Sequence, residues 1–300
     1  MRRRIFFTAL VAAGVAMVYA CANASSAGSG SASSPADGEL QLPTVPEELT
    51  RQSDRADYVL TRFWDALDFT APAARDTAFM ERNFADFLRL MPQASSDSVR
   101  SVAVDNLLTR ASSDSLALDL AGWLAETSLN STDAPTYSEG TYIMFLRRLA
   151  TSERVDEAMR ERYMAQLRDM DCNRPGSVAA DFPYTAADGS KSTIHELTAA
   201  HDSTLIVFYD PDCHDCHVLI DSLSRDTSVS AALASGSMAI MALYPYDDTD
   251  LWRRTASELP SGWIVATNPS VIEEEGMYYL PRTPRTYLLD RSARILRLRE

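Results

Sequence analysis

The residues of this sequence best suited to chemistry are two cysteines, Cys213 and Cys216, separated by two residues. An apolar stretch before them, Leu205 to Tyr209, predicts a buried strand that ends by Pro211. Apolar residues at helical spacing follow from Val218 onward and predict a helix. Unpaired backbone N–H groups at a helix N-terminus favour a cysteine thiolate, which attacks disulfides. The pattern therefore predicts a redox-active pair, with Cys213 as nucleophile and Cys216 as resolving thiol.

Three other uses of the cysteine pair are open. With His217 the motif reads CxxCH, the attachment pattern of c-type haem, for which Met241 or Met277 is a candidate distal ligand. A zinc site would need a second pair of ligands at finger spacing, which the sequence lacks. The third alternative is a binding or scaffold protein in which Cys213 and Cys216 form a static disulfide.

Composition limits the classes of function. A chain of 300 residues with 46% hydrophobic content is long enough for two domains with real cores. A formal net charge of −14 repels phosphate backbones, so we expect no nucleic-acid partner. Four cysteines are too few for a disulfide-stapled scaffold. Cys172 is therefore interpreted as a boundary thiol, with disulfide transfer to Cys213 as the alternative.

The N-terminus has the pattern of an export signal. Three arginines precede an apolar run that ends at Ala20 and is too short for a comfortable membrane span, so residues 1–20 are predicted to be a signal peptide. The run ends in Val-Tyr-Ala-Cys, which resembles the lipobox of bacterial lipoproteins and implies lipidation of Cys21. The alternative is ordinary cleavage after Ala24. Residues 21–45 are rich in Ser, Ala and Gly and predict a flexible tether.

The next segment, residues 46–170, has only helical periodicity. Its apolar residues recur every three or four positions, and breaks at Pro92, at Ser112 to Asp114 and at Asn130 to Pro135 divide it into about six helices. We expect its aromatic residues and methionines to form the core of an all-α domain. No cluster of His, Cys, Asp and Glu at metal-ligand spacing is found there.

Residues 171–300 alternate predicted strands with helices. A hairpin with its turn at Asp188-Gly189 is followed by a short helix, and the strand before the cysteine pair comes next. The later predicted elements are a strand at 238–243, a helix at 251–259, and strands at 262–267, 286–290 and 295–297. The pattern predicts an α/β module with one central sheet.

The order of these motifs resembles the thioredoxin fold of TlpA-like thiol–disulfide oxidoreductases. The motifs are Pro-Gly-x-x-Ala-x-Asp-Phe from Pro175, then Asp-Gly, then the CxxC pair and Thr283-Pro284 before a late strand. The whole chain resembles bacterial lipoproteins in which a helical domain of unknown function precedes a thioredoxin-like domain. The resemblance implies an all-α domain followed by a central mixed sheet flanked by helices. It also implies that Pro284 is a cis-proline and that Thr283 pairs its backbone with the substrate.

Two positions depart from the family pattern. Members carry an acid six residues before the first cysteine or three after the second, where this chain has Val207 and Leu219. Arg282 and Arg285, beside the proline, are interpreted as partner-steering or as solvated loop charges. Since the chain ends on its last strand, we also expect the helical domain or a second subunit to cover a sheet face.

Together these features predict a membrane-anchored thiol–disulfide oxidoreductase of the cell envelope, facing the periplasm from the inner or the outer membrane. A reductase is favoured over an oxidase. The expected partners are protein thiols and disulfides, an upstream membrane or periplasmic electron donor, and the membrane itself through the lipid anchor. No cofactor and no metal are expected.

Overall fold

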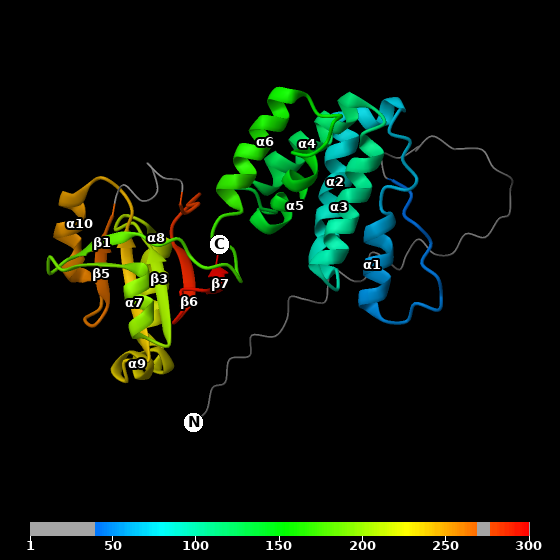
Figure 1. Cartoon of the computed structure of the whole chain (residues 1–300). Coiled ribbons are helices and arrows are strands. Elements are labelled where there is room, and N and C mark those ends of the chain that lie inside the picture. Colours follow the sequence, from blue (N-terminus) through cyan, green and yellow to red (C-terminus); the bar gives the residue numbers. More distant parts are fainter. Residues whose placement is uncertain (1–39, 269–276, 300) are drawn as a thin grey trace, which may run out of the picture. The chain divides into compact units, whose positions relative to one another are not determined.

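The structure, a computed structural model, describes residues 40–268 and 277–299 (Figure 1). Residues 40–170 form helices, as the periodicity predicts. The α-helices are α1 (Gln52–Arg62), α2 (Thr77–Leu90), α3 (Asp97–Ala111), α4 (Ser115–Leu129), α5 (Glu139–Leu149) and α6 (Glu157–Met170). Two short 3-10 turns, η1 (Pro72–Arg75) and η2 (Met91–Gln93), lie on either side of α2.

Side chains cap five of these six helices, and one of the caps, Asp114, lies at a predicted break. Asp76, Ser96, Asp114, Ser138 and Asp156 each accept a hydrogen bond from a backbone N–H in the first turn of the helix that follows. The apolar faces meet in one core with a central group of aromatic rings that pack edge to face or tilted. These rings belong to Phe63, Trp64, Phe84, Phe87 and Phe145.

The folded part begins earlier than the tether prediction of residues 21–45 allows. Leu40 packs in the helical core, and its backbone N–H donates a 2.9 Å hydrogen bond to the side chain of buried Asn83. An apolar side chain and a satisfied backbone donor fix this residue, which the composition of its N-terminal neighbours does not reveal. The signal peptide, Cys21 and the rest of the predicted tether up to residue 39 lie outside the described residues.

The second half contains a seven-stranded mixed sheet. Its order is β2-β1-β5-β4-β3-β6-β7, in which β3 pairs parallel with β4 and β4 with β5, and the other pairs are antiparallel. The strands are β1 (Pro183–Ala186), β2 (Lys191–Thr193), β3 (Ser203–Phe208), β4 (Met238–Tyr244), β5 (Ile264–Thr267), β6 (Arg285–Asp290) and β7 (Ile295–Arg299). The prediction of an all-α domain followed by a mixed sheet flanked by helices is confirmed.

Helices occupy both faces of the sheet (Figure 1). Alternate residues of β3 and β4 enter two separate cores, because successive side chains of a strand point to opposite faces. One core receives α7 (Ile194–Ala200), and the other receives α8 (His214–Arg225), α9 (Thr227–Ala234) and α10 (Thr249–Thr255), which runs into η3 (Ala256–Glu258). Helix α9 was not predicted from the sequence.

The face that was expected to need outside cover is filled by the module itself. Beside α7, Phe182 and Tyr278 pack edge to face with ring centroids 5.4 Å apart, and both are buried in that core. The helical domain contacts the module through Tyr279, which packs against the helical core, and through Arg285 at the start of β6.

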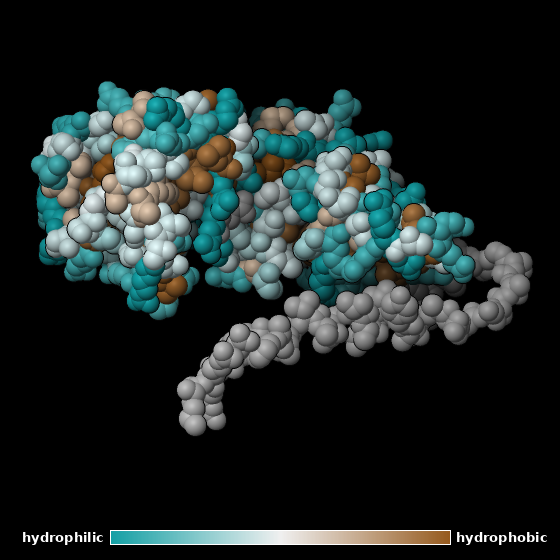
Figure 2. Space-filling model, turned by 90° about the horizontal axis from the view of Figure 1, so that it is seen from below, coloured by the Kyte–Doolittle hydropathy of each residue, from teal (hydrophilic) through white to brown (hydrophobic). Residues whose placement is uncertain are grey.

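No helix among residues 40–268 and 277–299 is both long and apolar enough to cross a membrane. On the face drawn in Figure 2, hydrophobic residues form separate small patches among hydrophilic ones. The large apolar side chains that are exposed are Leu42, Val102, Leu116, Trp123, Met164, Val178, Val218 and Leu296.

Candidate active site

Cys213 lies at the N-terminus of α8, as the sequence predicts. It is the N-cap residue, and its Sγ accepts a 3.2 Å hydrogen bond from the backbone N–H of Cys216. The sulfur therefore receives a donor that the helix leaves unpaired, and it lies at the positive end of the helix dipole. Cys213 is half-buried, so a partner disulfide can reach it. This arrangement places the Cys213 sulfur where a backbone donor and a partner disulfide can both reach it.

Cys216 is buried one turn further into the same helix. Its side chain packs in the core that contains Val207 and Tyr209, and it is fully inaccessible to solvent. Burial, with a hydrogen bond to Cys213, raises the pKa of the Cys216 thiol to about 12. The two cysteines are thus distinct: one is accessible to a partner, and the other can reach only its neighbour.

Thr283 and Pro284 lie next to the nucleophile despite their distance in sequence. The Thr283–Pro284 peptide bond is cis, and the Cys213 thiol lies 3.4 Å from the Thr283 carbonyl oxygen, to which it donates. The register of the sheet explains the proximity, because Phe208 of β3 pairs with Arg285 of β6. The structure brings Cys213, Cys216 and Thr283 together, and their roles in exchange stay predictions.

The polar residues around the pair do not supply the missing buried acid. Val207 and Leu219 pack in the core beside Cys216, as their types require. Asp215 is exposed, and Asp221 forms an exposed ion pair with Arg225. His217 donates from Nε2 to the Pro211 carbonyl oxygen at 2.7 Å. None of these carboxylates or imidazoles is buried beside the resolving thiol.

Two tyrosines near the cysteines were missed by sequence reasoning. Tyr209 is buried, and its hydroxyl has no hydrogen-bond partner among the described residues. It lines a cavity of about 400 Å³ together with Asp210 and His214. Tyr246, from the loop after β4, interacts with Thr283 and with both cysteines, and burial raises the pKa of its hydroxyl. Both looked like ordinary core residues in the apolar pattern.

The metal and haem alternatives fit the geometry poorly. Met241 and Met277 both pack in or against the core on one face of the sheet, whereas Cys216 lies in the core on the other face. Neither methionine is therefore placed as a distal haem ligand for the CxxCH motif. Among the described residues, no group of three or more His, Cys, Asp and Glu side chains is arranged to hold a metal ion.

The remaining predicted residues have clear positions. Cys172 is a free thiol that follows α6 and donates to the Asp169 carbonyl oxygen at 2.9 Å, and burial raises its pKa. Arg282 is exposed, as expected for a loop charge. The interpretation of Arg285 as a partner-steering or solvated charge is wrong, because only 2% of its side chain is exposed and it is paired with Glu139.

The fold and the site together define a thioredoxin-like protein that carries an additional helical domain. A solved thioredoxin-like protein from Bacteroides caccae ATCC 43185 has this fold, with a TM-score of 0.79 and 24% sequence identity, over 86% of this chain and 93% of that one. Residues 20–173 match the family described as Domain of unknown function (DUF5106). The chain belongs to the DUF5106 family.

Two further solved structures each match less than half of this chain. One is a conserved protein of unknown function from Bacteroides fragilis, with 30% identity over 41% of this chain and 90% of that one, and a TM-score of 0.39. The other is the thioredoxin domain of a thiol–disulfide oxidoreductase from Bacteroides vulgatus, with 17% identity over 42% and 89%, and a TM-score of 0.37. A comparison with curated proteins found no match.

Proposed function

We propose that the chain is a membrane-anchored thiol–disulfide oxidoreductase that acts outside the cytoplasm. The observation that carries the proposal is the placement of Cys213. Its sulfur lies at the N-terminus of α8, beside a buried partner thiol and 3.4 Å from the Thr283 carbonyl oxygen. A static disulfide would need neither the difference in burial between the two cysteines nor a backbone carbonyl placed beside the outer one.

The reaction is a two-step exchange. The Cys213 thiolate attacks one sulfur of the substrate disulfide, forms a mixed disulfide and releases the other sulfur as a thiolate. The Cys216 thiolate then attacks the Cys213 sulfur, closes the Cys213–Cys216 disulfide and releases the second substrate thiolate. Two electrons pass from the pair to the substrate, and the protons of the two thiols end on the released sulfurs. An upstream electron donor of the envelope then reduces the pair again.

The acids beside the motif favour the reductase direction. A strongly oxidising pair requires a stabilised thiolate in its reduced form. Here Asp212 and Asp215 flank the first cysteine and oppose a negative charge on it, whereas His214 favours it when protonated. We therefore propose that the reduced pair donates electrons to protein disulfides.

The replacement Cys216→Ser should trap the first intermediate. Without the resolving thiol, the mixed disulfide between Cys213 and a polypeptide substrate should persist and appear as a heavier species on a non-reducing gel. Thiol reductants should cleave this disulfide and remove the heavier species. The double variant Cys213→Ser/Cys216→Ser is the matched control and should trap nothing. A Cys216→Ser protein that is folded but captures no disulfide-bonded polypeptide would favour the alternative, a binding protein with a static disulfide.

Location at the membrane is proposed from the N-terminal sequence. The basic and apolar run before Cys21 is typical of exported lipoproteins. Lipidation would keep Cys21 as the first residue of the mature protein, whereas ordinary cleavage after Ala24 would remove it. Full-length protein expressed in a bacterial host should therefore sediment with membranes and be released by detergent. The Cys21→Ser variant should instead be found in the soluble fraction or remain as unprocessed precursor. Equal membrane association of both forms, after processing to the same length, would contradict lipid anchoring.

A further inference from the structure

The segment that carries Thr283 and Pro284 is tied to the helical domain at several points. Tyr279 packs against the helical core, and its hydroxyl donates to the Asn130 side chain at 3.4 Å. The Arg282 guanidinium lies 5.0 Å from the centre of the Tyr137 ring, a cation–π distance. Arg285 forms a two-pronged ion pair with Glu139, the first residue of α5. Contacts from the helical domain thus flank Thr283 and Pro284 on both sides.

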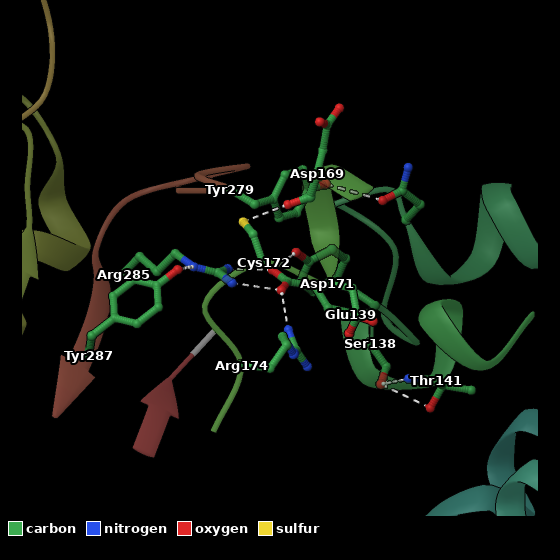
Figure 3. Close-up of polar contacts among 12 residues, drawn as sticks. Ser138, Glu139, Thr141, Asp169, Asp171, Cys172, Arg174, Tyr279, Arg285 and Tyr287 are labelled. Carbon is green, nitrogen blue, oxygen red and sulfur yellow. Dashed lines mark hydrogen bonds and ion pairs between the residues drawn. The ribbon is translucent and has the colours of Figure 1, made fainter. Parts of the chain in front are cut away.

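Glu139 is the centre of a buried polar network (Figure 3). Its carboxylate accepts from both terminal nitrogens of Arg285, at 2.8 Å for Nη2, and from Arg174 at 3.1 Å. The Tyr137 hydroxyl donates to the same carboxylate at 2.7 Å. Arg285 also donates from Nε to the Tyr287 hydroxyl at 2.9 Å. The Glu139 carboxylate thus accepts hydrogen bonds from Arg285, Arg174 and Tyr137, and Tyr287 accepts a further one from Arg285.

Forming such a network removes charged groups from water, which costs free energy, and its hydrogen bonds then fix the orientation of the side chains. Glu139 is fully buried and Arg285 is 2% exposed, so both charges have lost their hydration. Burial alone would raise the pKa of Glu139, but the hydrogen bonds and charge of Arg285 outweigh it and hold that pKa below its ordinary value. A buried pair of this kind contributes little net stability compared with apolar packing, whereas its forked geometry fixes the position of its members.

The position that the network fixes belongs to the candidate active site. Arg285 follows Pro284 directly, and the Thr283 carbonyl oxygen lies beside the Cys213 sulfur. We infer that the DUF5106 domain holds the Thr283–Pro284 segment in place through Glu139 and Arg285, and so sets how tightly an extended polypeptide substrate binds beside Cys213. Glu139 is then a positioning residue, and the inference rests on the proposed oxidoreductase function.

The inference separates two kinds of substrate. A polypeptide disulfide that pairs its backbone with Thr283 beside Cys213 depends for its affinity on the position of the segment. A small aromatic disulfide needs only access to the Cys213 sulfur. Disturbing the network should therefore affect the polypeptide reaction and spare the small-molecule reaction, whereas general damage to the fold would slow both.

The test is Glu139→Gln in the full chain, which keeps the size of the side chain and removes its charge. We expect KM for a disulfide-bonded polypeptide to rise about tenfold, with kcat at saturation within about twofold of wild type, since misplacement of a binding element costs such factors. The rate with a small aromatic disulfide should be unchanged. Hydrogen exchange of the backbone amides of residues 277–285 should become faster.

Glu126→Gln is the matched control. Glu126, on α4, accepts hydrogen bonds from Arg162 and Gln166 of α6, so these contacts stay within the helical domain. This variant should leave KM and the exchange of residues 277–285 unchanged. Should Glu139→Gln fail to fold, Tyr137→Phe removes only one donor to the Glu139 carboxylate and should raise KM by about threefold, less than Glu139→Gln because the donors from Arg285 and Arg174 remain.

Each outcome decides a separate point. Unchanged KM and unchanged amide exchange in folded Glu139→Gln and Tyr137→Phe would overturn the inference, as would an equal rise in KM for Glu126→Gln. If the wild-type protein reduces no disulfide, the proposed function fails instead. Hydrogen exchange then still tests whether Glu139 anchors the Thr283–Pro284 segment. If the amides of residues 277–285 exchange no faster in Glu139→Gln than in wild type, the anchoring is overturned as well.

Discussion

The rate at which Cys216 resolves a mixed disulfide should rise about tenfold for each pH unit between about pH 7 and pH 10. The attacking species is the thiolate, and burial, the largest cause, raises the pKa of Cys216 above that of an exposed cysteine; the hydrogen bond with the Cys213 thiol, which also raises it, is lost in the mixed disulfide. Below its pKa, the fraction of thiolate increases tenfold per unit, so the rate follows the pH without levelling off in this range. An exposed cysteine with an ordinary pKa near 9 would level off above about pH 9.

A single reagent can separate the two steps. With a stoichiometric aromatic disulfide, attack by Cys213 releases one coloured thiolate and resolution by Cys216 releases the second. The slower phase of colour should carry the steep pH dependence in a Cys172→Ser background, which removes the other free thiol of the described residues. Cys216→Ser is the control and should show only the first phase, with half the amplitude. A second phase that levels off near pH 9 would contradict the burial argument.

The residues beside Cys216 bear on how fast it resolves the mixed disulfide at neutral pH. Val207 and Leu219 stand where related proteins place a carboxylate, and both pack in the core beside Cys216. With apolar side chains at these two positions, neither supplies a carboxylate that would take up the Cys216 proton. The chain should therefore exchange slowly at neutral pH, and resolution rather than attack should limit its rate.

Much of the fold follows from local sequence patterns. Helical periodicity with Asp and Ser caps locates α1 to α6, and the alternation of apolar runs with turns locates the strands of the sheet. The two cysteines were found because a short motif at a strand–helix junction carries its own chemistry. Helix α9 was missed because none of its residues is buried, which leaves little apolar pattern to detect.

The contacts between distant parts of the chain could not be read in this way. Glu139 looks like an ordinary acid in the first turn of a helix, and Arg285 looks like one position of an alternating strand. Local periodicity does not relate positions that are 146 residues apart. Likewise, the composition around residue 40 predicts a tether, although the packing of Leu40 depends on a distant partner, Asn83. Such pairings are set by the tertiary fold.

Replacing Glu139 with leucine should lower the free energy of unfolding by about 3 to 5 kcal/mol. The substitution leaves the Arg285 charge buried without its carboxylate, and an uncompensated buried charge is among the most destabilising changes in a protein core. Equilibrium denaturation in urea, followed by tryptophan fluorescence, measures the loss. The pKa of Glu139 is lowered in the folded protein, so its ionised form stabilises the wild type above pH 4.5, the ordinary pKa of the carboxyl. Below that pH the wild type progressively loses this stabilisation. The difference in stability between wild type and Glu139→Leu should therefore shrink as the pH falls below 4.5.

The double variant Glu139→Leu/Arg285→Met separates burial cost from attraction. Apolar side chains of similar size need no hydration, so the double variant should recover most of the stability, to within about 1 kcal/mol of wild type. Disrupting the exposed pair Arg147–Asp171 by Arg147→Ala is the control, and it should cost at most about 1 kcal/mol because solvent screens these charges. If Glu139→Leu costs no more than this control, the buried network does not hold the two parts of the chain together. A stable double variant that still binds polypeptide disulfides weakly would show that the charges are retained for position rather than for stability.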